Sequence, residues 1–204
     1  MKLLLATGNR KKVAELRMLL EGSGVELLVP DDVGGLEEVV EDAPTFSGNA
    51  RKKAAAAAEA TGHWALADDS GLEVEALDGA PGVFSARWAG AHGDDAANNA
   101  LLLERLAGIP EEKRGARFVC ALALARPGGE IVADFEGTTS GRILEAPRGT
   151  RDFGYDPLFL FTESGHEVTG RGFAELSPEE KSSVSHRGRA LRALSEQLHQ
   201  VMAG

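Results

Sequence analysis

Cysteine is almost absent from this sequence, because Cys120 is the single thiol among 204 residues. One thiol excludes an intrachain disulfide and a cysteine-rich zinc site. Its apolar neighbours at 118–125 favour a buried, inert side chain. Long hydrophobic runs are also missing: no stretch approaches the ~20 apolar residues that span a bilayer, and the apolar start of the chain is too short for a signal peptide. We therefore expect a cytoplasmic protein without a membrane partner.

Positive charge is in short supply. Lys and Arg number 22 against 32 Asp and Glu, so the formal net charge is −10. A chain this acidic lacks the broad basic face that binds a nucleic acid polymer or an anionic membrane. The rest of the composition, 43% apolar and 26% charged, is that of a globular protein. A chain of 204 residues then makes one domain, with one or two lobes.

The hydrophobic pattern predicts strands and helices in alternation. Strands are expected at residues 2–6, 25–29, 64–67, 117–125, 130–138 and 156–161. Helices are expected at 11–20, 47–60, 94–106 and about 187–201, with a short helix beginning at Ser177-Pro178. The hairpin in mid-chain indicates a mixed sheet with a second lobe, and ligands commonly bind between lobes. We predict an α/β fold for residues 1–204: a single two-lobed domain, with a mixed sheet flanked by helices and a central substrate cleft.

The loop after the first strand combines glycine with basic residues. It contains Thr7, Gly8, Asn9, Arg10, Lys11 and Lys12. The N–H groups of a helix N-terminus and a glycine backbone suit a phosphate. The loop has neither the spacing of a P-loop nor that of a dinucleotide-binding fingerprint. Phosphate binding and a simple strand-to-helix turn with solvated lysines both fit these residues.

Acidic residues gather at two places. Asp68 and Asp69 follow the third expected strand, where two carboxylates are costly unless they are paired or bound to a metal such as Mg²⁺. Glu41 and Asp42 add further acid before the alanine-rich helix. Lys53, near the start of that helix, opposes the helix dipole, which a negative ligand would offset. A solvated turn and a solvated lysine are the alternatives.

Two later segments suit a planar base. One is the tight turn of Phe153, Gly154, Tyr155 and Asp156, in which a ring can stack and a carboxylate can accept an N–H. The other is the pair His186 and Arg187, one turn after Lys181, whose donors suit a carbonyl oxygen or a phosphate. A turn with a core aromatic and a polar helix cap fit the same residues.

The order and spacing of these motifs closely resemble the inosine triphosphate pyrophosphatase family. The matching segments run from residue 3 to about 195. They are residues 5–9 with Lys12, Thr45-Phe46 with Asn49 and Lys53, residues 67–72, 79–87 and 154–157, Glu175-Leu176 with Lys181, and residues 185–188. The resemblance implies hydrolysis of ITP, dITP and XTP between the α and β phosphates, giving the monophosphate and pyrophosphate. It also implies Mg²⁺ dependence and a homodimer.

Carried onto these positions, the resemblance implies a triphosphate site and a metal site. Residues 7–12, Lys53 and Ser70 would contact the nucleotide. Asp69 matches the family's proton acceptor, and Asp68 is a neighbour that could share this work. Glu41 and Asp69 match its metal positions. Glu41 is chosen by its distance from Thr45-Phe46, over the nearby acids Glu37, Glu38 and Asp42.

The same resemblance implies how the base is recognised. Phe153 would stack on it, Asp156 would accept its N1–H, and His186 and Arg187 would donate to its O6. Gly154, Tyr155 and Lys181 complete this predicted set. Adenine carries an amino donor in place of O6, so it would leave those donors unpaired.

Two other functions fit the sequence. One is a related house-cleaning pyrophosphatase for pyrimidine or modified nucleotides. The other is a nucleotide-binding regulatory module without turnover. The adjacent Asp68 and Asp69 argue against the module, because a pure anion binder gains nothing from acid beside a phosphate.

Overall fold

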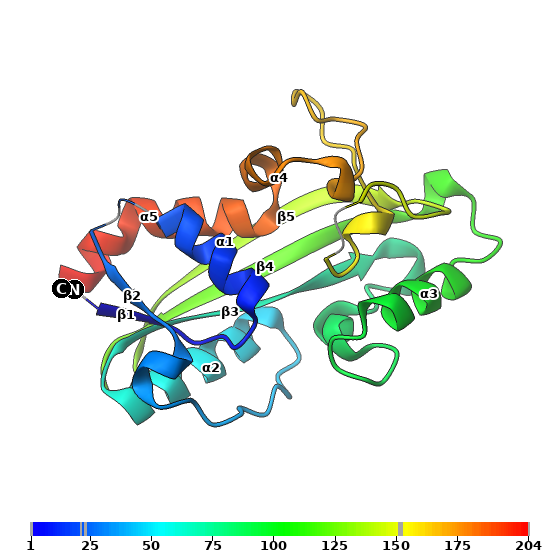
Figure 1. Ribbon diagram of the computed structural model, residues 1–204. Helices are drawn as coiled ribbons and strands as arrows, with labels where there is room; N and C mark the ends of the chain where they lie inside the picture. The colour runs from blue at the N-terminus through cyan, green and yellow to red at the C-terminus, as the bar shows by residue number, and fades with distance from the viewer. Residues whose placement is uncertain (1, 21, 23, 151–152, 204) are drawn as a thin grey trace. The chain divides into compact units, whose positions relative to one another are not determined.

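The computed structural model describes residues 2–20, 22, 24–150 and 153–203. Its strands form a six-stranded mixed sheet in the order β2-β1-β3-β4-β5-β6 (Figure 1). They are β1 (Lys2–Leu5), β2 (Glu26–Leu28), β3 (Trp64–Val74), β4 (Gly115–Ala125), β5 (Ile131–Ile143) and β6 (Phe159–Phe161). β1 pairs in parallel with β2 and β3, whereas β6 pairs antiparallel with β5. The predicted mixed α/β fold is confirmed.

The expected helices are present with small shifts in their ends. They are α1 (Arg10–Leu20), α2 (Phe46–Thr61), α3 (Asp95–Arg105), α4 (Pro178–Val184) and α5 (His186–Ala203). The predicted capping box begins α4: the Ser177 hydroxyl accepts the Glu180 N–H, and the Glu180 carboxylate accepts the Ser177 N–H. Within the described residues, no helix is both long and apolar enough to cross a membrane.

The chain divides into two compact units. Unit 1 comprises Met1–Asp69, Cys120–Gly137 and Arg187–Gly204, and unit 2 comprises Ser70–Val119 and Thr138–His186. The boundaries between the units fall within β3, β4, β5 and the first turn of α5. The single two-lobed domain with a central substrate cleft stays a prediction.

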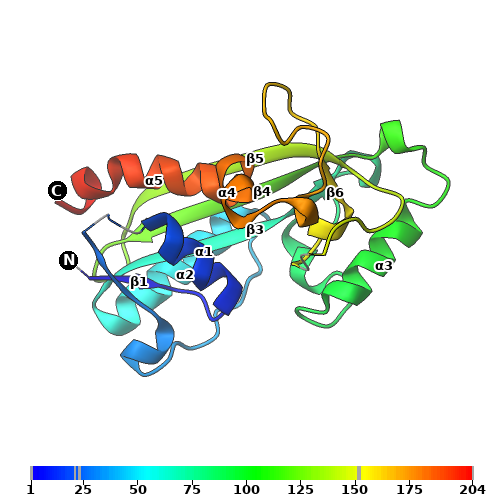
Figure 2. The same ribbon diagram turned by 45° about the horizontal axis from the view of Figure 1, so that its top comes forward.

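In unit 1, helices cover both faces of the sheet. Helices α1 and α5 lie on one face and α2 lies on the other (Figure 1), and the face with α1 and α5 comes forward in Figure 2. The core on the first face includes Leu16 of α1 and Leu191 and Leu194 of α5, together with the buried Cys120. Helix α2 buries Ala54 and other alanines, whose small side chains allow a helix to approach a sheet closely.

Unit 2 has an aromatic core. The ring centroid of Phe118 lies 4.5 Å from that of Phe159 and 5.8 Å from that of Phe173. Leu72 of β3 and Leu102 of α3 are fully buried in the same cluster. Such close aromatic packing stabilises the positions of the residues that contact it.

The third strand is longer than expected. A strand is expected over 64–67, but β3 continues through Asp68, Asp69, Ser70 and Gly71 to Val74. The expectation was wrong because Leu72 and Val74 are fully buried and extend the apolar pattern beyond the acids. The strand expected at 156–161 is also shorter, since Asp156–Leu158 forms a 3-10 turn with Pro157 in its first turn and only Phe159–Phe161 is extended.

Candidate functional site

Two adjacent carboxylates of β3 have different partners. Successive side chains of a strand point to opposite faces of its sheet. Asp68 accordingly contacts Lys12 of α1 and Arg187 of α5, whereas Asp69 contacts Asn49 and Lys53 of α2. These partners belong to the helices that cover the two faces of unit 1 (Figure 1). The two acids therefore have separate surroundings.

Asp68 is a buried, ion-paired carboxylate. Its Oδ2 lies 2.9 Å from Lys12 Nζ and 3.6 Å from a guanidinium nitrogen of Arg187. Burial alone would raise the pKa of Asp68, but the charges of Lys12 and Arg187 outweigh it and hold that pKa well below the usual value. A carboxylate with so low a pKa is a weak base. Asp68 is therefore better suited to link β3 to α1 and α5 by ion pairs than to accept a proton.

Asp69 is the stronger base of the pair. Its Oδ2 accepts from Asn49 Nδ2 at 3.1 Å, and its Oδ1 lies 3.5 Å from Lys53 Nζ. Burial raises the pKa of Asp69 above its ordinary value, helped by the nearby charge of Glu41, and Lys53 offsets only part of this rise. A raised pKa makes a carboxylate a better proton acceptor.

Lys53 joins Asp69 to a second acid. Its ammonium lies 3.1 Å from Oε1 of Glu41, the acid predicted as a metal ligand. Asp42 instead forms an exposed pair with Lys52, and Glu37 and Glu38 are exposed. Burial would lower the pKa of Lys53, but Asp69 and the other nearby carboxylates outweigh it and raise that pKa. Lys53 therefore stays charged.

Asn49 is a site residue that the sequence reasoning did not assign. It is fully buried, donates to Asp69, and accepts the Ala43 N–H on its Oδ1 at 2.9 Å. The Asn49 side chain thus hydrogen-bonds both to Asp69 and to the backbone of the segment that carries Glu41. The signal was its position four residues before Lys53, on the same face of α2.

The residues present fit a hard divalent cation. Within the described part of the chain, no group of at least three His, Cys, Asp or Glu side chains forms a ready metal cluster. Glu41 and Asp69 nevertheless converge on one ammonium group, Lys53 Nζ. Two carboxylates are a common protein contribution to a cation whose other ligands come from a substrate phosphate and water.

The basic loop caps α1. Asn9 Oδ1 accepts the Lys12 N–H at 3.2 Å, and the Thr7 hydroxyl accepts the Asn9 N–H at 3.2 Å. Gly8 and Asn9 are exposed, so the helix begins at the surface. The side chains of Arg10 and Lys11 lie outside the described part of the structure. The geometry is that of a helix N-terminus, which attracts anions.

Unit 2 contains the residues predicted to recognise a base except Arg187, which belongs to unit 1. Lys181 forms an ion pair with the buried Asp156, and its Nζ lies 5.1 Å from the centroid of the Phe153 ring. The His186 ring stacks on Phe118 with centroids 4.8 Å apart and planes 16° apart. These contacts bring the aromatic, the acid and Lys181 of the prediction together.

Three predicted residues have other surroundings. The Tyr155 hydroxyl is buried and donates to the Ser85 carbonyl at 2.9 Å, and burial together with the charge of Asp95 raises its pKa. Arg187 contacts Asp68, although it was predicted to act beside His186 on the base. Consecutive helical residues point about 100° apart, which accounts for this divergence. Ser70 is half-buried within β3.

A basic helix N-terminus near a carboxylate with raised pKa, on a mixed α/β sheet, is typical of enzymes that act on phosphates. The Ham1 family model matches residues 3–197 of this chain. The chain therefore belongs to the Ham1 family.

Relatives match along nearly the whole chain. A dITP/XTP pyrophosphatase of Corynebacterium glutamicum is 50% identical over 206 residues, which cover 100% of this chain and 99% of that protein. A dITP/XTP pyrophosphatase of Mycobacterium tuberculosis is 52% identical over 206 residues, covering 100% and 98%. The structure of a HAM1 protein from Coxiella burnetii superimposes with a TM-score of 0.87 at 38% identity, covering 98% of this chain and 99% of that one.

Proposed function

We propose that this protein is a nucleoside triphosphate pyrophosphatase. It hydrolyses the non-standard purine nucleotides dITP, ITP and XTP to the monophosphate and pyrophosphate, which removes them from the nucleotide pool. Similar proteins named dITP/XTP pyrophosphatase support this substrate class. The observation that carries the proposal is Asp69, a buried carboxylate with a raised pKa between Asn49, Lys53 and Glu41.

The proposed triphosphate site is the N-terminus of α1. Its N–H groups, Asn9 and Lys12 would bind phosphate oxygens, and Lys53 would add positive charge. Lys12 and Lys53 are already paired with carboxylates. Their positions are therefore set before substrate arrives, which lowers the entropy cost of binding.

Glu41 and Asp69 are the proposed Mg²⁺ ligands. When bound, Mg²⁺ offsets the charge of the phosphates and of the leaving pyrophosphate. The two carboxylates and the relatives' activity support a divalent cation at this place. Loss of either acid should therefore weaken the response to Mg²⁺.

Asp69 is the proposed proton acceptor. It would orient a water and take its proton while the water oxygen forms a bond to the α phosphorus. The bond between that phosphorus and the bridging oxygen breaks, and pyrophosphate leaves with the bond's electron pair. Asn49 would hold Asp69 in place by its hydrogen bond at 3.1 Å. Asp68, with its low pKa, would support this arrangement through Lys12 without accepting the proton itself.

The proposed base contacts are donors for O6 and an acceptor for N1–H. His186 and Arg187 donate, Asp156 accepts, and Phe153 stacks. Asp156 is ion-paired with Lys181, and a carboxylate can accept further hydrogen bonds on its remaining lone pairs. Adenine would bring a donor against donors, so ATP should be a poor substrate.

Two further expectations from the family resemblance belong to this proposal. The protein would work as a homodimer, and it would act in the cytoplasm.

A substrate panel tests the proposal. Pyrophosphate release is measured from dITP, ITP, XTP, ATP, GTP, dTTP and UTP, with Mg²⁺ and with EDTA. We expect release from the first three to exceed that from ATP strongly and to need Mg²⁺. Preference for dTTP or UTP would instead support the pyrimidine enzyme. Tight ITP binding without pyrophosphate would support the regulatory module.

A further inference from the structure

Helix α3 holds one residue of the predicted base-recognition turn by both of its backbone polar groups. The Gly154 N–H donates to Asp95 Oδ2 at 2.8 Å, and the Gly154 carbonyl accepts from Asn99 Nδ2 at 2.8 Å. Asp95 and Asn99 are four residues apart and therefore lie on the same face of α3. All three residues belong to unit 2.

Gly154 is the residue whose conformation sets the turn. It lies between Phe153 and Tyr155, and its φ of +56° is in the left-handed region that other residues rarely adopt. A change at this residue would move Phe153, the proposed stacking ring, relative to Asp156, the proposed acceptor. Because Gly154 makes two hydrogen bonds to α3, its conformation is stabilised by residues outside the turn.

Asn99 shows that the contact is specific. Its Nδ2 reaches Gly154, but its Oδ1 is buried without a hydrogen-bond partner among the described residues. A buried, unpaired acceptor is unfavourable, and a leucine of similar size would avoid it. The amide at position 99 is therefore explained by the bond that it donates to Gly154.

We propose that Asp95 and Asn99 are positioning residues for base discrimination, which act on Phe153 and Asp156 through Gly154. This inference rests on the proposed function and deepens it. Selectivity for ITP over ATP then depends on a helix outside the predicted substrate-binding set.

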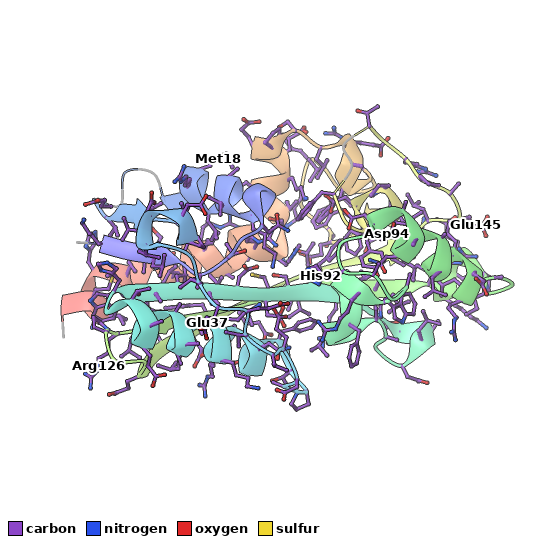
Figure 3. The ribbon with its side chains drawn as sticks, turned by 60° about the horizontal axis from the view of Figure 1, so that its bottom comes forward. Met18, Glu37, His92, Asp94, Arg126 and Glu145 are labelled. Atoms are coloured by element: carbon purple, nitrogen blue, oxygen red, sulfur yellow. The ribbon has the colours of Figure 1, made fainter. Side chains whose placement is uncertain are left out.

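The test compares variants of one helix. Asp95→Ala and Asn99→Leu each remove one bond to Gly154. The matched control is Asp94→Ala. Asp94 lies at the start of α3 (Figure 3), where its Oδ1 accepts the Ala97 N–H at 2.9 Å. Its loss weakens the same helix but leaves both Gly154 bonds in place.

Three readouts are used on the full chain. Hydrogen–deuterium exchange of residues 153–158 reports on the turn without needing activity. The ratio of kcat/KM for ITP to that for ATP reports on base discrimination. Inhibition of ITP hydrolysis by inorganic tripolyphosphate reports on phosphate binding alone.

We expect Asp95→Ala and Asn99→Leu to speed exchange in the turn and to lower the ITP-over-ATP ratio about tenfold, the scale of one lost hydrogen bond. Tripolyphosphate inhibition should not change. The double variant should lose little more than either single one, because both bonds act through Gly154. Asp95→Asn, which keeps an acceptor, should restore most of the ratio.

Other results would overturn the inference. Unchanged exchange and an unchanged ratio in both variants would do so, as would an equal fall in the ratio in Asp94→Ala. If the unaltered protein releases no pyrophosphate from ITP, the proposed function fails and the role in discrimination fails with it. Hydrogen–deuterium exchange separates the two failures. Faster exchange in Asp95→Ala would show that α3 holds the turn, even if the proposed function is wrong.

Discussion

The same isosteric change at two neighbouring residues should have opposite effects. Asp68→Asn and Asp69→Asn each replace a buried carboxylate with an amide. Asp68 is ion-paired with two cations that are themselves largely buried, since the side chain of Lys12 is 19% exposed and that of Arg187 is 4% exposed. Asp69 has a raised pKa, so the fold disfavours its charged form.

The magnitudes follow from these surroundings. Removing one partner of a buried ion pair costs about 3–5 kcal/mol, which for a chain of this size is a fall in Tm of roughly 6–20 °C. We expect that fall for Asp68→Asn. A raised carboxyl pKa means that the folded state binds the proton more tightly than the unfolded chain, so stability falls as pH rises through that range. Asp69→Asn removes this penalty and should leave Tm at pH 7 unchanged or higher.

Turnover should be lower in Asp69→Asn than in Asp68→Asn, the reverse of the order expected for Tm. Loss of a general base lowers kcat by at least about a hundredfold, so Asp69→Asn should be folded, stable and nearly inactive. The assays are thermal unfolding from pH 3 to pH 8 and pyrophosphate release from ITP. The stability deficit of Asp68→Asn should narrow below about pH 4, near the ordinary pKa of an aspartate. Near-normal turnover of Asp69→Asn, or equal losses of Tm in the two variants, would refute the reasoning.

Three further predictions concern the same region. Asn49→Ala removes the donor to Asp69 and the acceptor for the Ala43 N–H. We therefore expect kcat to fall about tenfold and the free energy of unfolding to fall by about 1–3 kcal/mol. An unchanged kcat, measured where the variant is fully folded, would contradict this. For the unaltered protein, kcat/KM should fall on acidification as the Asp69 carboxylate of the free enzyme, whose pKa is raised, takes up a proton; a profile of kcat/KM that is flat from pH 7 to pH 4 would be inconsistent with Asp69 as the base. Arg187→Ala should lower the ITP-over-ATP ratio of kcat/KM more than it weakens tripolyphosphate inhibition. A lowered Tm with an unchanged ratio would mean that Arg187 serves Asp68 alone.

The regular elements were predictable because their signals are local. The alanine run and Gly62 define α2, whose last turn ends with Gly62 in the left-handed conformation. The length of β3 was missed because Asp68, Asp69 and Ser70 are typical of a turn when they are considered without their partners. Beyond them Leu72 and Val74 are fully buried, and Asp68 and Asp69 are paired with side chains of α1, α2 and α5. These tertiary contacts keep the chain extended, and the residues at 68–70 do not reveal them.

The pairings within the candidate site could not be predicted from the sequence. Spacing alone favours Glu41 as a metal ligand, and its ion pair with Lys53 is visible only in the structure. The sequence assigns no role to Asn49, because a buried amide is informative only once both of its hydrogen bonds are known. The contact of Arg187 with Asp68 could not be predicted, because the two residues are far apart in the sequence. Sequence order identifies such residues, and tertiary contacts decide what each one does.

The cluster around β3 is balanced in formal charge. Its cations are Lys12, Lys53 and Arg187, and its carboxylates are Glu41, Asp68 and Asp69. With as many cations as anions, the folded protein needs no external ion to hold these groups together. A triphosphate that enters brings several negative charges, whereas each described cation of this cluster is already paired with a carboxylate. Substrate and countercharge should therefore bind as a pair, so that affinity for a nucleotide follows the concentration of its metal complex rather than that of the free anion.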